Sequence, residues 1–285
     1  MLLHHLSHKH LETCDDRAVL EEIAGMKQHR GAVMPLMPGA EPYHHDAGQI
    51  GVLLCHGFTG TPQSLRPWAE YLAGHGVSVS LPRQPGHGTR WQEMNRTRWE
   101  DWYAEVEKAF ADLQGRCAEV FVAGLSLGGC LALRLAEVHG AAIRGVMVVN
   151  PSITLDVPLL RLAPLLKWFV ASVPGVANDV KKPGVRELAY TRTPVKAAAS
   201  LPGLWSLVQA DLAKVTQPLL VFHSTEDHVV KPASVAIIRA KVPQATIEEL
   251  TDSYHVATLD NDADRIFAGS LDFIRTHASV PLQRD

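Results

Sequence analysis

The sequence predicts an α/β fold in which helices cover both faces of a mostly parallel central sheet. Short, continuous apolar runs that end at glycine or proline are typical of strands buried on both faces. Amphipathic stretches at helical spacing separate these runs, and the alternation begins near Gln49. With 285 residues, 46% of them hydrophobic, the chain can build one large core that also carries an insertion.

The first elements follow from apolar spacing. GVLLCHG at 51–57 predicts a buried strand, and SLRPWAEYLAGHG at 64–76 has its large apolar residues at helical spacing. VSVSLP, which begins at Val77, alternates as a strand does. RWEDWYAEVEKAFADL at 98–113 places its aromatic residues on one stripe of a helix, which we expect to face the core rather than a ligand.

The middle of the chain continues the same alternation. EVFVAG at 119–124 predicts a strand, LGGCLALRLAEVHG at 127–140 a helix, and GVMVVNP at 145–151 another strand. The pattern then stops for about sixty residues, 152–211, which are rich in proline and have no clear strand. Such a long insert between two sheet strands is usually functional, so we expect a small helical cap there.

The alternation resumes after the insertion. QPLLVFHS at 217–224 and ATIEEL at 245–250 predict strands, and helices are expected at 232–241 and 260–277. The predicted organisation is therefore an N-terminal extension over 1–36 and a folded domain over 37–285 that carries the cap. The extension holds a histidine cluster, interpreted as a solvated terminus rather than a metal site, and a short helix near 17–27.

Composition narrows the classes of function. The chain has 27 basic and 30 acidic residues, and this net charge of -3 gives no basic surface for nucleic acid. The four cysteines have no C-x-x-C spacing, so we expect free thiols in a reducing compartment and a cytoplasmic protein. Segment 157–176 is apolar, but Arg161, Lys167 and three prolines make a membrane span unfavourable and leave an amphipathic flap as the interpretation.

The stretch Gly124-Leu125-Ser126-Leu127-Gly128 matches G-x-S-x-G between a predicted strand and a predicted helix. This context is the one in which the motif forms a nucleophile elbow, a sharp turn that presents the serine hydroxyl above the sheet. Glycines leave room for the close backbone approach, and the N-terminus of the following helix offers free N–H groups.

A serine nucleophile needs a base, and the base needs an orienting carboxylate. Asp227 follows the strand at 217–224, and His255 follows the strand at 245–250, so both lie where open sheets place ligands. We expect Asp227 as the acid and His255 as the base. Glu226 is the alternative acid, and His228 adjoins the acid too closely in sequence to serve as the base.

The backbone N–H groups of Phe58 and Leu127 are the expected oxyanion donors, because one follows the first core strand and the other follows the serine. His56 is expected to brace this loop through a hydrogen bond, and His87 to support a neighbouring one. The other histidines have no usual ligand spacing, so no metal site is predicted and the chemistry needs no cofactor.

Five motifs together resemble the α/β-hydrolase superfamily, and within it bacterial carboxylesterases and monoacylglycerol lipases with a small cap: LLCHGFTGTPQSLRPWAEYL, LPRQPGHGT, GLSLGG, STEDHVV and SYHVATLD. The resemblance covers about Pro38 to His277. It implies an α/β-hydrolase fold, the same catalytic and oxyanion residues, and a cap over an apolar acyl pocket. Tyr254 stands where relatives often have glycine and Leu127 where they often have methionine, and Tyr254 is expected to crowd the site or narrow the substrate range.

The sequence thus predicts a serine hydrolase that cleaves small or lipid-like carboxylic esters through an acyl-enzyme. A ligand receptor on the same fold with little turnover is the alternative, and so is an amide, thioester or lactone hydrolase, because a triad serves acyl transfer generally. Most of the apolar cap residues are expected to pack on the body of the fold, and the remainder to line a tunnel for an acyl group or to make transient contact with a lipid surface. The sequence does not indicate an oligomeric state.

Overall fold

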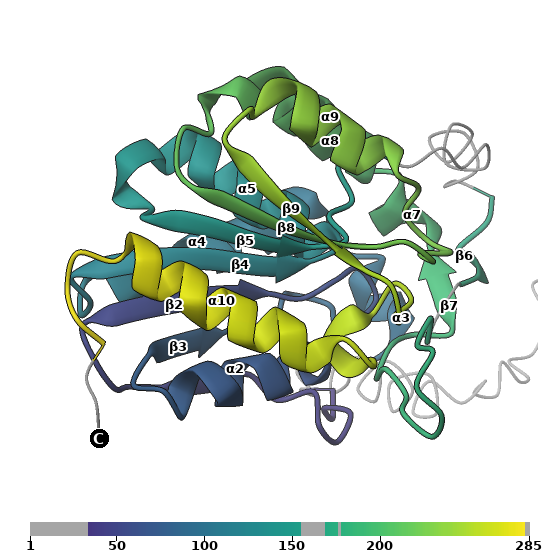
Figure 1. Cartoon of the computed structure of the whole chain (residues 1–285). Helices are drawn as coiled ribbons and strands as arrows, with labels where there is room; N and C mark the ends of the chain where they lie inside the picture. The colour runs from purple at the N-terminus through teal and green to yellow at the C-terminus, as the bar shows by residue number, and fades with distance from the viewer. Residues whose placement is uncertain (1–33, 155–168, 176–177, 283–285) are drawn as a thin grey trace, which may run out of the picture. The chain divides into compact units, whose positions relative to one another are not determined.

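A sheet between two layers of helices forms the frame of the molecule (Figure 1). The computed structural model describes residues 34–154, 169–175 and 178–282, and the compact folded unit begins at Leu36. Neighbouring strands are parallel except β1 and β3. In order across the sheet the strands are β1 (Tyr43–His45), β3 (Ser78–Leu81), β2 (Ile50–Cys55), β4 (Glu119–Leu125), β5 (Gly145–Val149), β8 (Leu219–Ser224) and β9 (Ala245–Leu250).

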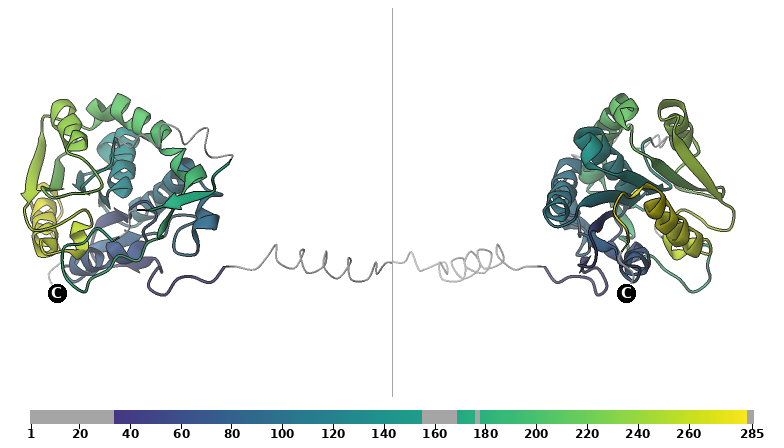
Figure 2. Two further views of the ribbon diagram at one scale, coloured as in Figure 1. Left: turned by 90° about the vertical axis from the view of Figure 1, so that its right-hand side faces the viewer. Right: turned by 60° about the vertical axis from the view of Figure 1, so that its left-hand side comes forward.

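Helices cover both faces of this sheet. α2 (Arg66–Ala73) and α10 (Ala263–His277) lie side by side on one face (Figures 1 and 2). The opposite face carries α4 (Trp99–Gln114), α5 (Leu127–His139), α8 (Leu201–Asp211) and α9 (Ala233–Lys241). The predicted fold class, a mostly parallel sheet with helices on both faces, is confirmed. The short elements are α3 (Trp91–Met94), α7 (Val195–Ala198) and the 3₁₀ turns η1 (Pro62–Ser64), η2 (Gly140–Ala142), η3 (Leu212–Lys214) and η4 (Ala257–Leu259).

The central strands bury side chains in two separate cores, which explains their unbroken apolar runs. On β4, Val120 and Val122 belong to the core beneath α4 and α5, whereas Phe121 and Ala123 belong to the core beneath α2 and α10. Side chains alternate across a strand, so a strand covered on both sides must be apolar at every position. This arrangement fixes the carboxyl end of β4, where the candidate nucleophile follows.

The insertion between β5 and β8 contains more regular structure than its sequence indicates. β6 (Ser172–Pro174) and β7 (Arg192–Pro194) form a separate antiparallel pair, so the expectation that 152–211 has no strand is wrong on this point. Strands of three residues are too short to give a periodic pattern. α8 then leads the chain back from the insertion to β8, and its side chains pack in the same core as those of α5.

Edge strand β1 also has no signal in the sequence. It pairs antiparallel with β3, in the register that sets Tyr43 opposite Leu81 and His45 opposite Val79. Its histidines are exposed, so no apolar alternation marks it as a strand. At the other end of the chain, α10 begins at Ala263, three residues later than predicted.

Some expectations concern residues outside the described ranges. These are the histidine cluster and the helix near 17–27 in the N-terminal extension, and most of the apolar segment 157–176. Within the described ranges, none of the helices is both long enough and apolar enough to cross a membrane.

α5 carries a buried carboxyl group that the fold must accommodate. The side chain of Glu137 has no exposed surface, and its Oε2 accepts a hydrogen bond from Arg134 at 2.9 Å. Arg134 also donates to Asp211 at the end of α8, at 2.8 Å. Burial raises the pKa of Glu137 to about 7, although the contact with Arg134 acts in the opposite direction.

The substitution Glu137→Gln tests this burial. Above pH 7 the wild-type carboxyl must ionise inside the protein, whereas below its unfolded pKa it is neutral in both states. Its contribution to stability is therefore present at acid pH and lost as pH rises toward 7. In urea titrations, the difference in free energy of unfolding between variant and wild type should shift in favour of the variant by about 2 kcal/mol from pH 5 to pH 8.

Glu100→Gln, at an exposed position in the first turn of α4, is the control and should show little pH-dependent gain. A gain for Glu137→Gln that is the same at both pH values would contradict the assignment.

Candidate active site

Ser126 occupies a strained turn between β4 and α5. Its backbone has φ 57° and ψ -117°, a region that costs a non-glycine residue roughly 1–3 kcal/mol. Three hydrogen bonds hold the turn: the Ser126 N–H donates to Val149 O at 2.9 Å, and Ser126 O accepts from Cys130 and Ser152 at 3.2 and 3.0 Å. The strain persists because the neighbouring strand and helix determine this conformation.

Two glycines make this turn possible. A Cβ on Gly124 would overlap the carbonyl group of Gly128, and a Cβ on Gly128 would overlap the carbonyl group of Cys55 at the end of β2. All of these atoms belong to the backbone, so no side-chain rotation can relieve the overlap. The spacing of the motif therefore reflects contact between β2, β4 and α5 directly beneath the serine.

Asp227 and His255 form a hydrogen-bonded pair at the ends of β8 and β9. Asp227 Oδ2 lies 2.8 Å from His255 Nδ1, and the Asp227 side chain is only 2% exposed. Asp227 Oδ1 accepts the backbone N–H groups of Val229 and Val230, both at 2.8 Å. Burial opposes ionisation, but the bonds from His255 and from these N–H groups outweigh it and hold the pKa of Asp227 below its usual value. The carboxylate therefore stays charged and can orient the imidazole.

The backbone of His255 is held by Asn150, a residue outside the motifs recognised in the sequence. Asn150 directly follows β5, with φ 44°, and its Nδ2 donates to His255 O at 2.8 Å. Its Oδ1 accepts the Ser224 N–H at 2.8 Å. The sequence signal that could have identified Asn150 is its position as an amide at the carboxyl end of a predicted central strand.

The alternative acid and base have other partners. The Glu226 carboxylate contacts Lys181 Nζ at 3.2 Å and is 49% exposed. His228 Nδ1 lies 2.8 Å from Asp179 Oδ1, and its side chain is 56% exposed. Neither side chain forms a hydrogen bond with Asp227 or His255.

The two expected oxyanion donors lie beside the serine. Phe58, Leu127 and Ser126 line one cavity with His255, and within the described ranges neither the Phe58 nor the Leu127 N–H donates to a protein atom. Leu127 is the first residue of α5, where N–H groups have no partner within the helix. Free N–H groups beside a hydroxyl could stabilise an oxygen that becomes negative during a reaction.

His56 braces the loop that carries Phe58, as expected. Its Nε2 accepts the Gln84 N–H at 3.2 Å, so its proton must be on Nδ1, which donates to Gly57 O at 3.0 Å. Burial lowers the pKa of His56 to about 4 and keeps the ring neutral. The ring of His87 packs against His56 at 5.0 Å between centroids, which supports its structural role.

The cavity above Ser126 has a volume of about 450 Å³ and an apolar wall. Asn178, Asp179 and Glu187 from the insertion add polar groups to the lining, and Asp179 Oδ2 accepts the His255 N–H at 3.1 Å. Tyr254 is not in the lining, because its ring packs on His228 at 4.5 Å and lies beneath Lys181 Nζ. The expectation that Tyr254 crowds the site is therefore not supported. The apolar lining residues are Phe58, Leu125, Leu127, Val170, Val173, Pro174, Val195, Ala198, Leu201, Trp205, Val229, Val230 and Val256.

Asp260 ties the insertion to the loop that carries His255. Its buried carboxylate accepts the N–H groups of Lys181 and Lys182 at 2.7 and 2.8 Å and that of Tyr254 at 2.9 Å. The backbone of Asp260 is extended, with φ -101° and ψ -168°, so α10 begins only after it, at Ala263.

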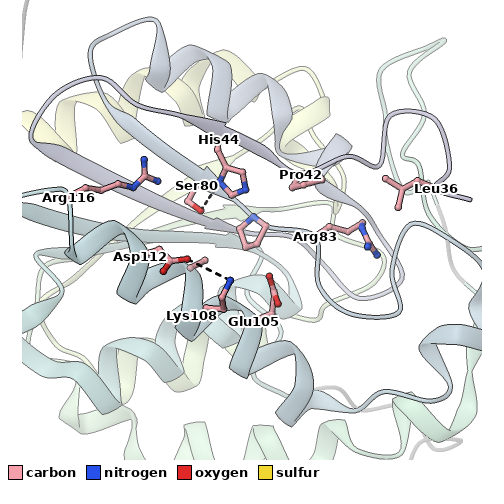
Figure 3. A pocket seen from close by; sticks show the side chains of 11 residues that line it. Leu36, Pro42, His44, Ser80, Arg83, Glu105, Lys108, Asp112 and Arg116 are labelled. Carbon is pink, nitrogen blue, oxygen red and sulfur yellow. Dashed lines mark hydrogen bonds and ion pairs between the residues drawn. The ribbon is translucent and has the colours of Figure 1, made fainter. Parts of the chain in front are cut away.

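A second cavity, of about 370 Å³, lies between β1, β3 and α4 and includes none of the predicted site residues (Figure 3). His44 bonds to Ser80 Oγ at 3.2 Å, and Lys108 lies 3.8 Å from Asp112. Some of the charged groups that line this second cavity are therefore paired with one another. Within the described residues, no group of three His, Cys, Asp or Glu side chains is arranged to hold a metal ion.

The fold and the turn at Ser126 together define the class: this is an α/β-hydrolase fold with a serine at the elbow after the central strand. The chain matches the alpha/beta hydrolase family over residues 52–268, and it belongs to that family.

The chain aligns with two curated relatives over nearly the whole length of each. The chain is 42% identical over 250 residues to the thermostable monoacylglycerol lipase of Bacillus sp. (strain H-257), which covers 86% of this chain and 98% of that protein. It is 27% identical over 243 residues to the carboxylesterase of Bacillus subtilis (strain 168), covering 82% and 96%. A solved structure of metagenome-derived lipolytic enzymes, LipS and LipT, superposes with a TM-score of 0.83 at 40% identity, covering 85% of this chain and all of that one.

The close backbone approach at the elbow predicts the effect of Gly128→Ala. The added methyl group would meet the Cys55 carbonyl, and overpacking against fixed atoms costs about 3 kcal/mol or more. Gly115→Ala is the matched control, because its Cβ would meet only ordinary contacts at 3.6 and 3.7 Å at a φ of -68°. We expect a large loss of urea stability for the first variant and almost none for the second. Equal stabilities would show that the elbow can open without cost.

Proposed function

We propose that the protein is a serine hydrolase that cleaves carboxylic esters, with Ser126 as nucleophile, His255 as base and Asp227 as acid. The observation that carries the proposal is the hydrogen-bonded pair of Asp227 and His255 in the same site as the strained serine turn. The relatives named a monoacylglycerol lipase and a carboxylesterase support ester hydrolysis.

In this mechanism the Ser126 hydroxyl attacks the ester carbonyl while His255 Nε2 takes its proton. Nδ1 of His255 is engaged by Asp227, so Nε2 is the nitrogen left for that proton. The Asp227 carboxylate stabilises the imidazolium, and the Phe58 and Leu127 N–H groups donate hydrogen bonds to the oxyanion of the tetrahedral intermediate. His255 then gives its proton to the departing alcohol, and water activated by the same imidazole releases the acid from Ser126.

The cavity favours an ester with an apolar acyl chain and a small hydroxylated alcohol. Its wall of aliphatic and aromatic side chains suits the chain, whereas Asn178 and Glu187 provide polar atoms near His255. Glu187 comes close to the oxyanion loop, since a Cβ on Gly60 would lie 2.8 Å from Glu187 Oε1. A monoacylglycerol has both parts, in agreement with the 42% identical relative.

The setting we propose is the cytoplasm, with transient contact at a lipid surface. Cys55, Cys117 and Cys130 are free thiols, which favours a reducing compartment. Phe169 is 88% exposed beside Val170 of the cavity lining, so an apolar side chain stands near the site where a lipid ester would approach.

Ser126→Ala tests the catalytic assignment. We expect turnover of a p-nitrophenyl acyl ester to fall at least about 10⁴-fold, because no other group would form the acyl-enzyme. Ser206→Ala, on an exposed face of α8, should behave as wild type. Labelling of Ser126 by a fluorophosphonate without turnover of any ester would instead favour a receptor, and near-wild-type turnover by Ser126→Ala would exclude the proposed nucleophile.

A series of esters tests the substrate class. Monoacylglycerols of increasing chain length should give kcat/KM values that rise with each added CH₂ until the cavity is filled, since each buried CH₂ contributes about 0.8 kcal/mol. Esters of the same acids with ethanol should be poorer substrates, because they leave the polar groups near His255 unpaired. A strict preference for acetate esters would contradict an apolar acyl site.

A further inference from the structure

One carboxylate from the insertion connects the two loops that carry the acid and the base. Asp179 Oδ1 lies 2.8 Å from His228 Nδ1, next in sequence to Asp227. Asp179 Oδ2 accepts the backbone N–H of His255 at 3.1 Å and that of His228 at 3.3 Å. The Asp179 side chain is 13% exposed, and its bond to the His255 N–H is partly buried, whereas its bonds to His228 lie at the surface.

The main chain of Asp179 adds a further bond to the same loop. Its carbonyl oxygen accepts the Val256 N–H at 3.0 Å. Together with Asn150 on the His255 carbonyl at 2.8 Å, these contacts hold the backbone on both sides of the base. Asp227 sets the rotation of the imidazole, whereas Asp179 and Asn150 set where the ring is attached.

Asp179 acts through the hydrogen bonds that its carboxylate accepts, as well as through packing. Hydrogen bonds to a carboxylate are stronger than those between neutral groups, and a buried N–H left without an acceptor is costly. The hydrogen bond and the charge of Asp179 also raise the pKa of His228, so the contact can become an ion pair. A shift of about 1 Å in the base would reduce the reaction rate roughly 100-fold.

We propose that Asp179 is a positioning residue for ester hydrolysis, because it fixes the backbone of His255 and joins the loop of the base to the loop of the acid. This inference rests on the proposed catalytic roles of Asp227 and His255. On this inference the insertion positions His255 in addition to lining the cavity.

The test compares three variants of the full chain by kcat and KM on p-nitrophenyl butyrate: Asp179→Ala, Asp179→Asn and Lys181→Ala. Lys181 is the matched control, because its Nζ contacts Glu226 and Asp252, both at 3.2 Å. It therefore links the same segment to the same two loops without a contact to His255. Asn at 179 is nearly isosteric and keeps one oxygen that can accept the His255 N–H.

We expect Asp179→Ala to lower kcat roughly 10- to 100-fold with KM nearly unchanged. Asp179→Asn should recover part of this loss, and Lys181→Ala should remain within about twofold of wild type, as expected for a surface ion pair. Loss of a cavity wall alone would raise KM instead, and loss of stability alone would lower the melting temperature without changing kcat.

A kcat within twofold of wild type for Asp179→Ala, or an equal loss for Lys181→Ala, would overturn the positioning role. If Asp179→Ala does not fold, Asp179→Leu takes its place, because leucine has a similar shape and no acceptor: an unchanged kcat overturns the role, and a severalfold lower kcat at constant KM supports it. Ser126→Ala in the same assay separates the two proposals: its activity tests the proposed function, whatever the result at Asp179.

Discussion

The contact of three backbone segments beneath Ser126 is the constraint on which the rest of the site depends. The end of β2, the turn after β4 and the first turn of α5 approach so closely that side chains are excluded at Gly124 and Gly128. This contact holds Ser126 at φ 57°, and Phe58 and Leu127 line the same cavity as Ser126. The two buried cores hold β2 and β4 in register, with Cys55 opposite Gly124, so the strain at one residue is supported by the whole sheet.

The sequence was most informative where local chemistry decides the structure. The strands around β4 are apolar at every position because they are covered on both faces, and glycine is required at 124 and 128, so both signals are visible in a single chain. The loops after β8 and β9 could be placed at the same edge because parallel strands bring their carboxyl ends together. The sequence predicted the pair of Asp227 and His255 with Glu226 as the alternative acid, and in the structure Asp227 is the carboxylate that lies 2.8 Å from His255 Nδ1.

Contacts between distant segments could not be predicted in this way. Asp179 and Asp260 look like ordinary loop carboxylates, yet each accepts two backbone N–H groups from residues far away in the sequence. The contacts of Tyr254 could not be predicted either. Its ring packs against His228 and lies beneath Lys181 Nζ, and no sequence pattern places these residues beside it. β1, β6 and β7 have three residues each and were missed because periodicity needs length.

The path of α8 has a consequence for how the insertion can be changed. Leu201 and Trp205 line the cavity, but Leu204 and Val208 of the same helix pack in the core with α5, and the helix returns the chain to β8. A shortened or hybrid enzyme must therefore keep α8 for the core, and its replaced segment before Leu201 must still supply a carboxylate in the place of Asp179.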